Sequence, residues 1–309
     1  MNRIEFHHEY EARSKQHRAV TVSGRGLHTG AESCVEIARG AEITAPVTLG
    51  GPKKSGAAAR FPLSACCVAE SARSTRLVGG GLAGTSAVDA STVEHLLAAF
   101  AGLGVHRGVD ITLFGPEVPL ACGSARSWVD ALGAIGFPAK RERDDVRDPD
   151  RETELIVARD AFIALGDGWY RFTRGAGVHV GVTCAWPYAY LEPRASWNGS
   201  RSDFAARIAP ARTIALAEEA LALVSRGLAQ FVDPVSVVLV SPDGLVTQGA
   251  PAEADEPARH KLLDVLGDLY VHGGPPRGRV EAHRPSHART HEAIRQALTC
   301  GALVRRGAS

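Results

Sequence analysis

The spacing of apolar residues predicts the same order of elements in each half of the chain. Four apolar side chains after Ser91 fall on one helical stripe, and glycines at positions 102 and 104 end the pattern. A β-branched, apolar run then predicts a strand, and a second helical pattern follows it. The predicted helix, strand and helix cover about 91–102, 109–114 and 124–132 in the first half, and about 257–270, 279–283 and 286–298 in the second.

Short apolar runs lie upstream of both of these units and are typical of strands. They occupy residues 19–22, 35–37, 155–157, 178–182 and 237–240. Strands followed by helices in each half predict an α+β fold. The expected architecture is two domains of related topology, each a β-sheet with helices on one face.

A charged segment separates the two halves. Between Lys140 and Glu154, twelve of fifteen residues are charged, and Pro149 lies among them. Such a segment cannot bury a face, so it is predicted to be a linker or an exposed loop. The chain has 309 residues, which suits two domains better than one core. The predicted boundaries are 1–148 for an N-terminal α+β domain and 149–309 for a C-terminal α+β domain.

Composition narrows the classes of partner. Lys and Arg number 35 and Asp and Glu 34, so the formal net charge of +1 argues against a nucleic-acid partner. No signal-peptide pattern and no apolar run of membrane-spanning length is present, so stable membrane insertion is not expected and a cytoplasmic location is. Six cysteines without a Cys-x-x-Cys unit are expected to be reduced thiols.

A polar row on the helix predicted near the C-terminus offers the strongest local chemistry. His260, Asp264 and Asp268 are spaced four apart, so their side chains stack on one helix face. An imidazole and a carboxylate are metal ligands, and a second carboxylate can orient a neighbouring group. The alternative is a solvated helix face with an incidental His–Asp pair, and spacing alone favours that alternative.

Two further histidines extend this picture. In Ser91-Thr92-Val93-Glu94-His95, His95 could be a third metal ligand and Glu94 the base beside the attacking water. The same segment is also a capping box, in which Glu94 would only accept a hydrogen bond from the backbone of Ser91. His287, which follows Ser286 just before the last helix, is either a general acid or a surface histidine.

Taken together, longer segments resemble one known family. The matching segments are Gly24–Gly30, Ser91–Gly104, Pro116–Pro119, Gly123–Ala125, Ala211–Thr213, Ser225–Leu228, Arg259–Asp264 and Gly267–Leu269. In this order, from about residue 18 to residue 300, they resemble the UDP-3-O-acyl-N-acetylglucosamine deacetylase family, which acts in lipid A biosynthesis.

The resemblance implies a fold, a cofactor and a substrate. It implies two α+β domains packed against each other with the active site between them, and one catalytic Zn²⁺, with Fe²⁺ as the alternative ion in the cell. The expected substrate is a UDP-sugar that carries an acyl chain, and the expected state is a monomer. An insert at about 214–232 in the second domain would form the acyl-chain passage.

The resemblance also assigns site residues. It implies zinc ligands at His95, His260 and Asp264, one from the first domain and two from the second. It makes Glu94 the general base and His287 the general acid that protonates the departing amine. The remaining implied residues are Asp268, which orients the acid, Lys261 and Thr213, which hold the substrate carbonyl, and His28, Thr29, Arg159 and Ile214, which contact substrate.

Several positions depart from the family pattern where the substrate would lie. Cys122 replaces an aspartate, Ile214 an aromatic residue, Trp186 a histidine, and Arg159 a common lysine, while 230–233 replaces a Gly-Gly-Ser segment. No departure falls on a ligand, base or acid that the resemblance implies. Two alternatives to the family activity therefore stay open: a zinc amidase that acts on another acetylated sugar nucleotide, and a non-catalytic zinc-binding homologue.

Overall fold

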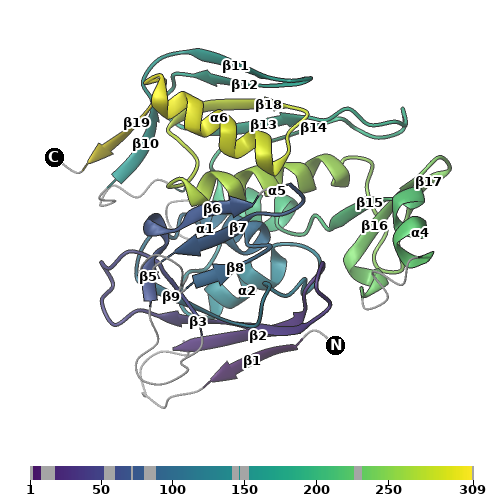
Figure 1. The fold of residues 1–309 in the computed structure, drawn as a ribbon, viewed down its shortest axis with the longest axis horizontal. Helices are drawn as coiled ribbons and strands as arrows, with labels where there is room; N and C mark the ends of the chain where they lie inside the picture. The colour runs from purple at the N-terminus through teal and green to yellow at the C-terminus, as the bar shows by residue number, and fades with distance from the viewer. Residues whose placement is uncertain are drawn as a thin grey trace.

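The computed structural model describes residues 3–7, 18–51, 60–70, 72–79, 88–140, 146, 153–225 and 232–307. Within them, helices lie between two larger sheets, one from each half of the chain (Figure 1). The predicted α+β class with two sheet-and-helix units is confirmed. The division at residue 148 lies outside the described residues, so that boundary stays a prediction.

The sheet of the first half has six strands in the order β1-β2-β3-β9-β4-β5. Helices α1 (Glu94–Leu103) and α2 (Arg126–Ala134) cover it. In β2 and β3, buried and less buried residues alternate, as expected for strands with one face on a core. The strands are β1 (Arg3–His7), β2 (Ala19–Arg25), β3 (Glu32–Arg39), β4 (Thr48–Gly50), β5 (Arg60–Pro62) and β9 (Val109–Phe114).

The sheet of the second half has five strands in the order β11-β12-β18-β13-β14. Its inner face packs against α5 (Glu256–Val271) and α6 (His287–Thr299), and β13 and β18 pair in parallel. The strands are β11 (Ala161–Leu165), β12 (Gly168–Thr173), β13 (Val178–Thr183), β14 (Arg194–Trp197) and β18 (Gly278–His283). The helix–strand–helix order that the sequence predicted is therefore present in both halves.

Three smaller sheets complete the described chain. The first, β6-β7-β8, precedes α1 in the chain. The second pairs β10 with the C-terminal strand β19, and the third, β15-β16-β17, belongs to the expected insert with helix α4. Their strands are β6 (Cys67–Glu70), β7 (Arg76–Gly79) and β8 (Val88–Ala90), then β10 (Thr153–Val157) and β19 (Leu303–Gly307), then β15 (Thr213–Leu216), β16 (Val237–Ser241) and β17 (Gly244–Val246). The other helical elements are η1 (Leu63–Ala65), α3 (Arg201–Asp203), η2 (Phe204–Ile208), α4 (Ala217–Ser225) and η3 (Pro234–Ser236). Across the described residues, no helix has the length and apolar character needed to cross a membrane.

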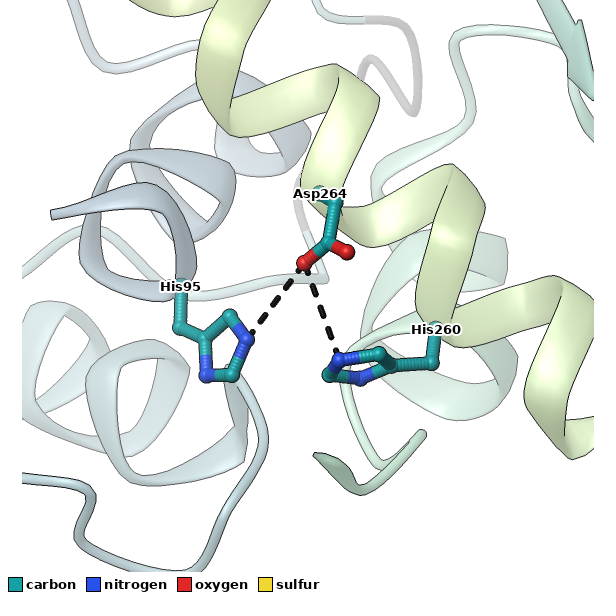
Figure 2. Close-up of side chains that lie close together, drawn as sticks. All are labelled: His95, His260 and Asp264. Carbon is teal, nitrogen blue, oxygen red and sulfur yellow. Dashed lines mark ion pairs between the residues drawn. The ribbon is translucent and has the colours of Figure 1, made fainter. Parts of the chain in front are cut away.

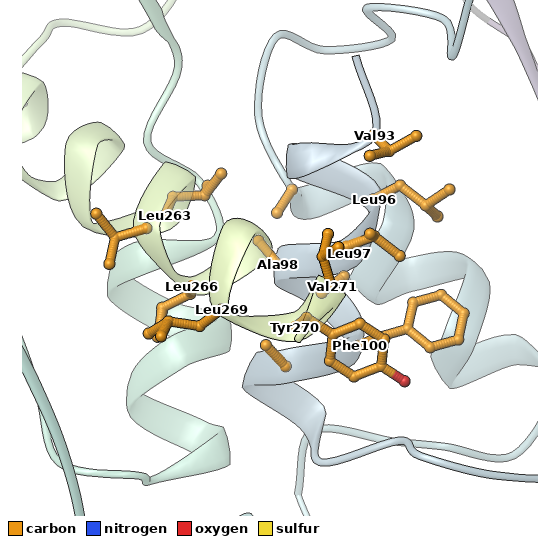
Figure 3. Close-up of a cluster of buried hydrophobic side chains, with 14 of the residues drawn as sticks. Val93, Leu96, Leu97, Ala98, Phe100, Leu263, Leu266, Leu269, Tyr270 and Val271 are labelled. Atoms are coloured by element: carbon orange, nitrogen blue, oxygen red, sulfur yellow. The ribbon is translucent and has the colours of Figure 1, made fainter. Parts of the chain in front are cut away.

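Helices α1 and α5 form the interface between the two halves. Every residue of α1 is buried, and so is every residue of α5 except Lys261. Figure 3 shows Leu97 and Phe100 of α1 beside Tyr270 of α5, within an apolar cluster that also contains Leu96 and Leu266. Each half therefore contributes one helix to a common core, and polar side chains on either helix are held by this packing.

The closest approach of the two helices is at a glycine of α5. A Cβ atom built on Gly267 would lie 2.0 Å from the carbonyl oxygen of Glu94, which is far inside van der Waals contact. Only a residue without a side chain fits here, so Gly267 brings the first turn of α1 against the middle of α5.

We expect Gly267→Ala to force α1 and α5 apart. Overpacking of this kind costs about 1–3 kcal/mol in the free energy of unfolding, and here it also displaces the residue that begins α1. Urea denaturation monitored by circular dichroism measures the loss. Gly133→Ala on α2 is the matched control, because its new Cβ has no atom within 4 Å. That variant should gain up to about 1 kcal/mol from helix propensity. Equal stability of the two variants would contradict the close approach.

Candidate active site

A strained turn places the start of α1. Thr92 has a φ of 59°, in the left-handed region that a β-branched residue seldom adopts. Its hydroxyl donates to Oε1 of the fully buried Glu117 at 2.7 Å. The same carboxylate accepts from the backbone nitrogens of His28 and Thr29 and from the Thr29 hydroxyl. Glu117 therefore ties the 24–30 loop to the turn that precedes α1.

The helix begins at Glu94 rather than at Ser91, and this removes the capping-box alternative. The residue before the first turn is Val93, which supplies no side-chain cap. The Glu94 carboxylate instead accepts a hydrogen bond from the backbone nitrogen of Thr75 at 3.0 Å. Glu94 is thus held by the residue just before β7, with its Oε1 facing the site.

Three buried side chains from α1 and α5 converge on one point (Figure 2). Oδ1 of Asp264 lies 3.5 Å from Nε2 of His95 and 3.6 Å from Nε2 of His260. A tetrahedral zinc site with ligand bonds of about 2.0–2.2 Å places neighbouring ligand atoms about 3.4 Å apart. Two imidazoles and a carboxylate at these separations fit a divalent metal ion with room for a fourth ligand.

The tautomer of His260 suits this role. Nδ1 of His260 lies 3.2 Å from the carbonyl oxygen of Ala211, which can only accept, so Nδ1 carries the proton and Nε2 keeps its lone pair. Burial lowers the pKa of His260 to about 4, so the imidazole is neutral near pH 7. A neutral imidazole is the form that binds a metal.

Lys261 keeps the buried aspartate ionised. Its Nζ donates to Oδ2 of Asp264 at 2.9 Å, which leaves Oδ1 directed at the two histidines. Burial alone would raise the pKa of Asp264, but the charge of Lys261 holds it well below its usual range. The carboxylate is therefore anionic near pH 7, the form that a metal ligand needs.

Glu94 and His287 face each other beside the triad. Nε2 of His287 lies 3.9 Å from Oε1 of Glu94. Burial raises the pKa of Glu94, which makes its carboxylate a better proton acceptor. Burial alone would lower the pKa of His287, but the charge and hydrogen bond of Asp268, with Glu94 nearby, raise it to about 10. A basic carboxylate and a protonated imidazole thus lie on one side of the site.

Asp268 orients that imidazole. Its Oδ2 lies 2.9 Å from Nδ1 of His287, and the carboxylate is 1% exposed. Although burial opposes ionisation, His287 and its hydrogen bond lower the pKa of Asp268. Because Nδ1 donates to the carboxylate, Nε2 is the ring atom that points into the site.

The residues expected to contact substrate lie on two separate segments, β15 and the loop after β2. Thr213 begins β15, two residues after the Ala211 carbonyl that contacts His260, and its hydroxyl donates to the Gly123 carbonyl at 2.9 Å. Ile214 is the next residue of β15 and is partly exposed. His28 and Thr29 lie on the loop that Glu117 holds.

Arg159 is not brought to the site. Its guanidinium donates to the Cys300 carbonyl, which follows the last residue of α6. His287 begins that helix of 13 residues, so Arg159 lies about 20 Å away at the opposite end. Arg159 lies in the β10–β11 turn, and its contact with substrate stays a prediction.

Sequence reasoning assigned no role to Thr75 or to Glu117. Thr75 lies in an irregular polar stretch with no periodicity, yet its nitrogen contacts Glu94 and its hydroxyl donates to Asp268 at 2.7 Å. Glu117 did carry a signal, because it lies in the matched segment 116–119, although nothing there indicated which groups it would bind.

Comparisons with known proteins agree with this geometry. Residues 15–299 match the family model described as UDP-3-O-acyl N-acetylglycosamine deacetylase. The chain belongs to this family. It is 32% identical over 292 residues to the UDP-3-O-acyl-N-acetylglucosamine deacetylase of Nostoc sp., covering 88% of this chain and 94% of that protein. It is 36% identical over 220 residues to the enzyme of that name from Thermosynechococcus vestitus, covering 71% and 72%.

Membership of this deacetylase family confirms the resemblance found in the sequence. The family consists of metalloenzymes that hydrolyse an amide bond, and the match spans both halves of the chain. The triad of His95, His260 and Asp264 is the one group among the described residues with metal-ligand spacing. The chain is therefore an amide hydrolase with a candidate metal centre between its two halves.

Proposed function

We propose that this protein is a zinc-dependent deacetylase that removes the acetyl group from UDP-3-O-(3-hydroxyacyl)-N-acetylglucosamine, the committed step of lipid A biosynthesis. One observation carries the proposal: a basic carboxylate, Glu94, and a protonated imidazole, His287, lie 3.9 Å apart beside a His-His-Asp triad. Hydrolysis of an amide needs both groups, because water must lose a proton and the amine must gain one.

His95, His260 and Asp264 would hold the metal ion. When bound, a divalent ion such as Zn²⁺ polarises the amide carbonyl and acidifies the attacking water. Two imidazoles and one carboxylate suit Zn²⁺, and Fe²⁺ would fit the same ligands.

Glu94 would accept the proton of the attacking water. Its Oε2 is fixed by the Thr75 nitrogen, so Oε1 keeps a constant direction during the reaction. Lys261 donates one of its three N–H groups to Asp264, which leaves two for the developing oxyanion. The Thr213 hydroxyl must turn from the Gly123 carbonyl to donate to the same oxygen.

His287 would protonate the departing amine. The nitrogen of an amide leaves only once it carries a proton, and Nε2 of His287 is a side-chain donor that faces Glu94 across 3.9 Å. Asp268 accepts from Nδ1, so the ring cannot turn its proton away from the site. Because the pKa of His287 is raised to about 10, the imidazole is protonated at pH 7, and activity should fall as pH rises through that ionisation.

Substrate binding would use the loop at 24–30 and the β15–β17 insert. His28, Thr29 and Ile214 lie on these two segments. The insert contains the apolar helix α4, in which Leu221 is 70% exposed, as the wall of an acyl-chain passage would be before substrate binds. The departures at Cys122, Trp186 and Ile214 make an altered acyl length the first variation to examine.

The proposal also covers the oligomeric state, the domain boundary and the location of the protein. A single chain supplies every residue of the site, which suits a monomer. The domain boundary falls at 148 and 149, in the charged segment. Six free cysteines and a nucleotide-sugar substrate suit the reducing cytoplasm.

Acetate release from the substrate tests the proposed function. We expect purified protein to release acetate, to stop when a chelator removes its metal, and to recover when Zn²⁺ is returned, because the ion supplies the Lewis acid. Activity that survives complete metal removal would contradict the metal's role. Metal-dependent release from a different acetylated sugar nucleotide, with none from this substrate, would instead establish the other amidase.

A further inference from the structure

Asp268 makes more polar contacts than its pairing with His287 requires. Its Oδ2 accepts from His287, while its Oδ1 accepts from the Thr75 hydroxyl at 2.7 Å. Nε2 of His291 lies 3.4 Å from the same Oδ1 and 2.9 Å from the Thr75 oxygen. His291 is buried and follows His287 by four residues on α6, so both imidazoles face α5.

The imidazole of His291 is in turn contacted by that of His272. Nε2 of His272, just after α5, lies 2.9 Å from Nδ1 of His291, and the two rings are 5.1 Å apart. Burial lowers the pKa of His272 to about 4, helped by His291, so this ring is neutral near pH 7. Beyond it lies β19, where Arg305 donates to the His272 carbonyl.

The hydrogen bonds of this cluster have one consistent direction. An ionised Asp268 can only accept, so the Thr75 hydroxyl donates to it. The Thr75 oxygen then accepts from Nε2–H of His291, and Nδ1 of His291 can accept from Nε2–H of His272. Every donor points toward Asp268.

Nδ1 of His287 contacts both oxygens of the Asp268 carboxylate, at 2.9 Å from Oδ2 and 3.1 Å from Oδ1. Thr75 and His291 approach Oδ1 alone. The charged groups around the His287–Asp268 pair are Glu94 on α1 and Asp264 on α5, and Arg305 on β19 lies near His272. Neither Glu94 nor Asp264 contacts Oδ1, so rotation of the carboxylate is restrained from the His291 side.

We infer that His291, backed by His272, is a positioning residue that holds the Asp268 carboxylate, through Thr75, in the orientation that directs His287 at the substrate. This inference rests on the proposed function, because it gives His291 a part in the same hydrolysis. Neither histidine touches substrate or metal. Their effect reaches the reaction through Asp268 and His287 alone.

His291→Leu tests this inference in the full-length, zinc-loaded protein. Loss of a group that orients a catalytic partner costs about 10- to 100-fold in activity, so we expect kcat to fall about 10-fold with KM changed less than about twofold. Zinc content should not change. His291→Gln keeps an N–H donor for Thr75 and should restore kcat to within about threefold of the wild type.

A double variant shows whether His272 acts through His291. His272→Leu alone should lower kcat by less than His291→Leu does. The double variant His272→Leu, His291→Leu should have the same kcat as His291→Leu. His179→Leu is the matched control. His179 is a half-buried histidine of β13. It contacts none of the cluster residues Asp268, Thr75, His291 and His272.

A spectroscopic readout makes the inference independent of activity. In NMR spectra of protein labelled with ¹⁵N-histidine, the chemical shift of the Nδ1 proton of His287 should change in His291→Leu. It should stay the same in His179→Leu. An unchanged His287 signal overturns the inference even if the enzyme is active, and so does an equal loss of kcat in His291→Gln and His291→Leu. A wild-type protein that releases no acetate overturns the proposed function, while a shifted His287 signal would still support the positioning.

Discussion

Replacement of Glu94 by glutamine is expected to lower kcat about 10²- to 10⁴-fold while the protein keeps its zinc. Glutamine has nearly the same shape, and its carbonyl oxygen can still accept from the Thr75 nitrogen. It cannot take a proton from water, however. The loss should therefore appear in kcat, with the unfolding midpoint close to that of the wild type.

Steady-state kinetics together with zinc analysis on the same sample check this expectation. Glu281→Gln is the control, because Glu281 lies on the face of β18 away from the helices and pairs with Arg171 and Arg279. Loss of zinc along with activity would show that Glu94 is a metal ligand. Activity near that of the wild type would show that another group accepts the proton.

Asp264→Ala is expected to remove the metal itself. Loss of a residue that merely orients a ligand costs about 10- to 100-fold in metal affinity, so loss of the only anionic ligand should cost more. It also leaves the Lys261 ammonium without its partner beside two histidines. Zinc content after dialysis against a weak chelator measures the effect.

Asp268→Asn is the matched control for Asp264→Ala. Both carboxylates are buried on the same face of α5, one turn apart, but only Asp264 lies within reach of both histidine ligand atoms. We expect the asparagine variant to keep its zinc and to lose activity through misorientation of His287. Equal zinc loss in the two variants would contradict the separation of ligand from orienting residue.

The regular elements were predictable because each has a strong local pattern. The helix predicted at 257–270 occurs as α5 at Glu256–Val271, and the strand predicted at 109–114 occurs as β9 with those bounds. The row of His260, Asp264 and Asp268 followed from helical spacing alone. What spacing could not decide was burial, which distinguishes a metal centre from a solvated helix face.

The start of α1 shows where local reasoning failed. The sequence Ser91-x-x-Glu94 satisfies a capping box, yet Thr92 adopts a left-handed conformation and the helix begins at Glu94. The cause is not local, because Glu117 and Thr75 bind this turn from distant parts of the chain.

Contacts between distant residues account for most of what the sequence did not reveal. Thr75 and Asp268 are 193 residues apart, and His291 has no feature that separates it from the other histidines. The strands of the β6-β7-β8 sheet have only three or four residues each, too short for an alternating pattern to be recognised. Such contacts exist only once the two halves have packed.

The packing of α1 on α5 also links metal uptake to folding. One candidate ligand comes from α1 and two from α5, so a chain in which these helices have not docked offers no complete set of ligands. The binding free energy of the ion must therefore add to the free energy that joins the halves. A newly made chain can retain such an ion only after its folding is finished, and loss of the ion would loosen the interface on which the placement of both Glu94 and His287 depends.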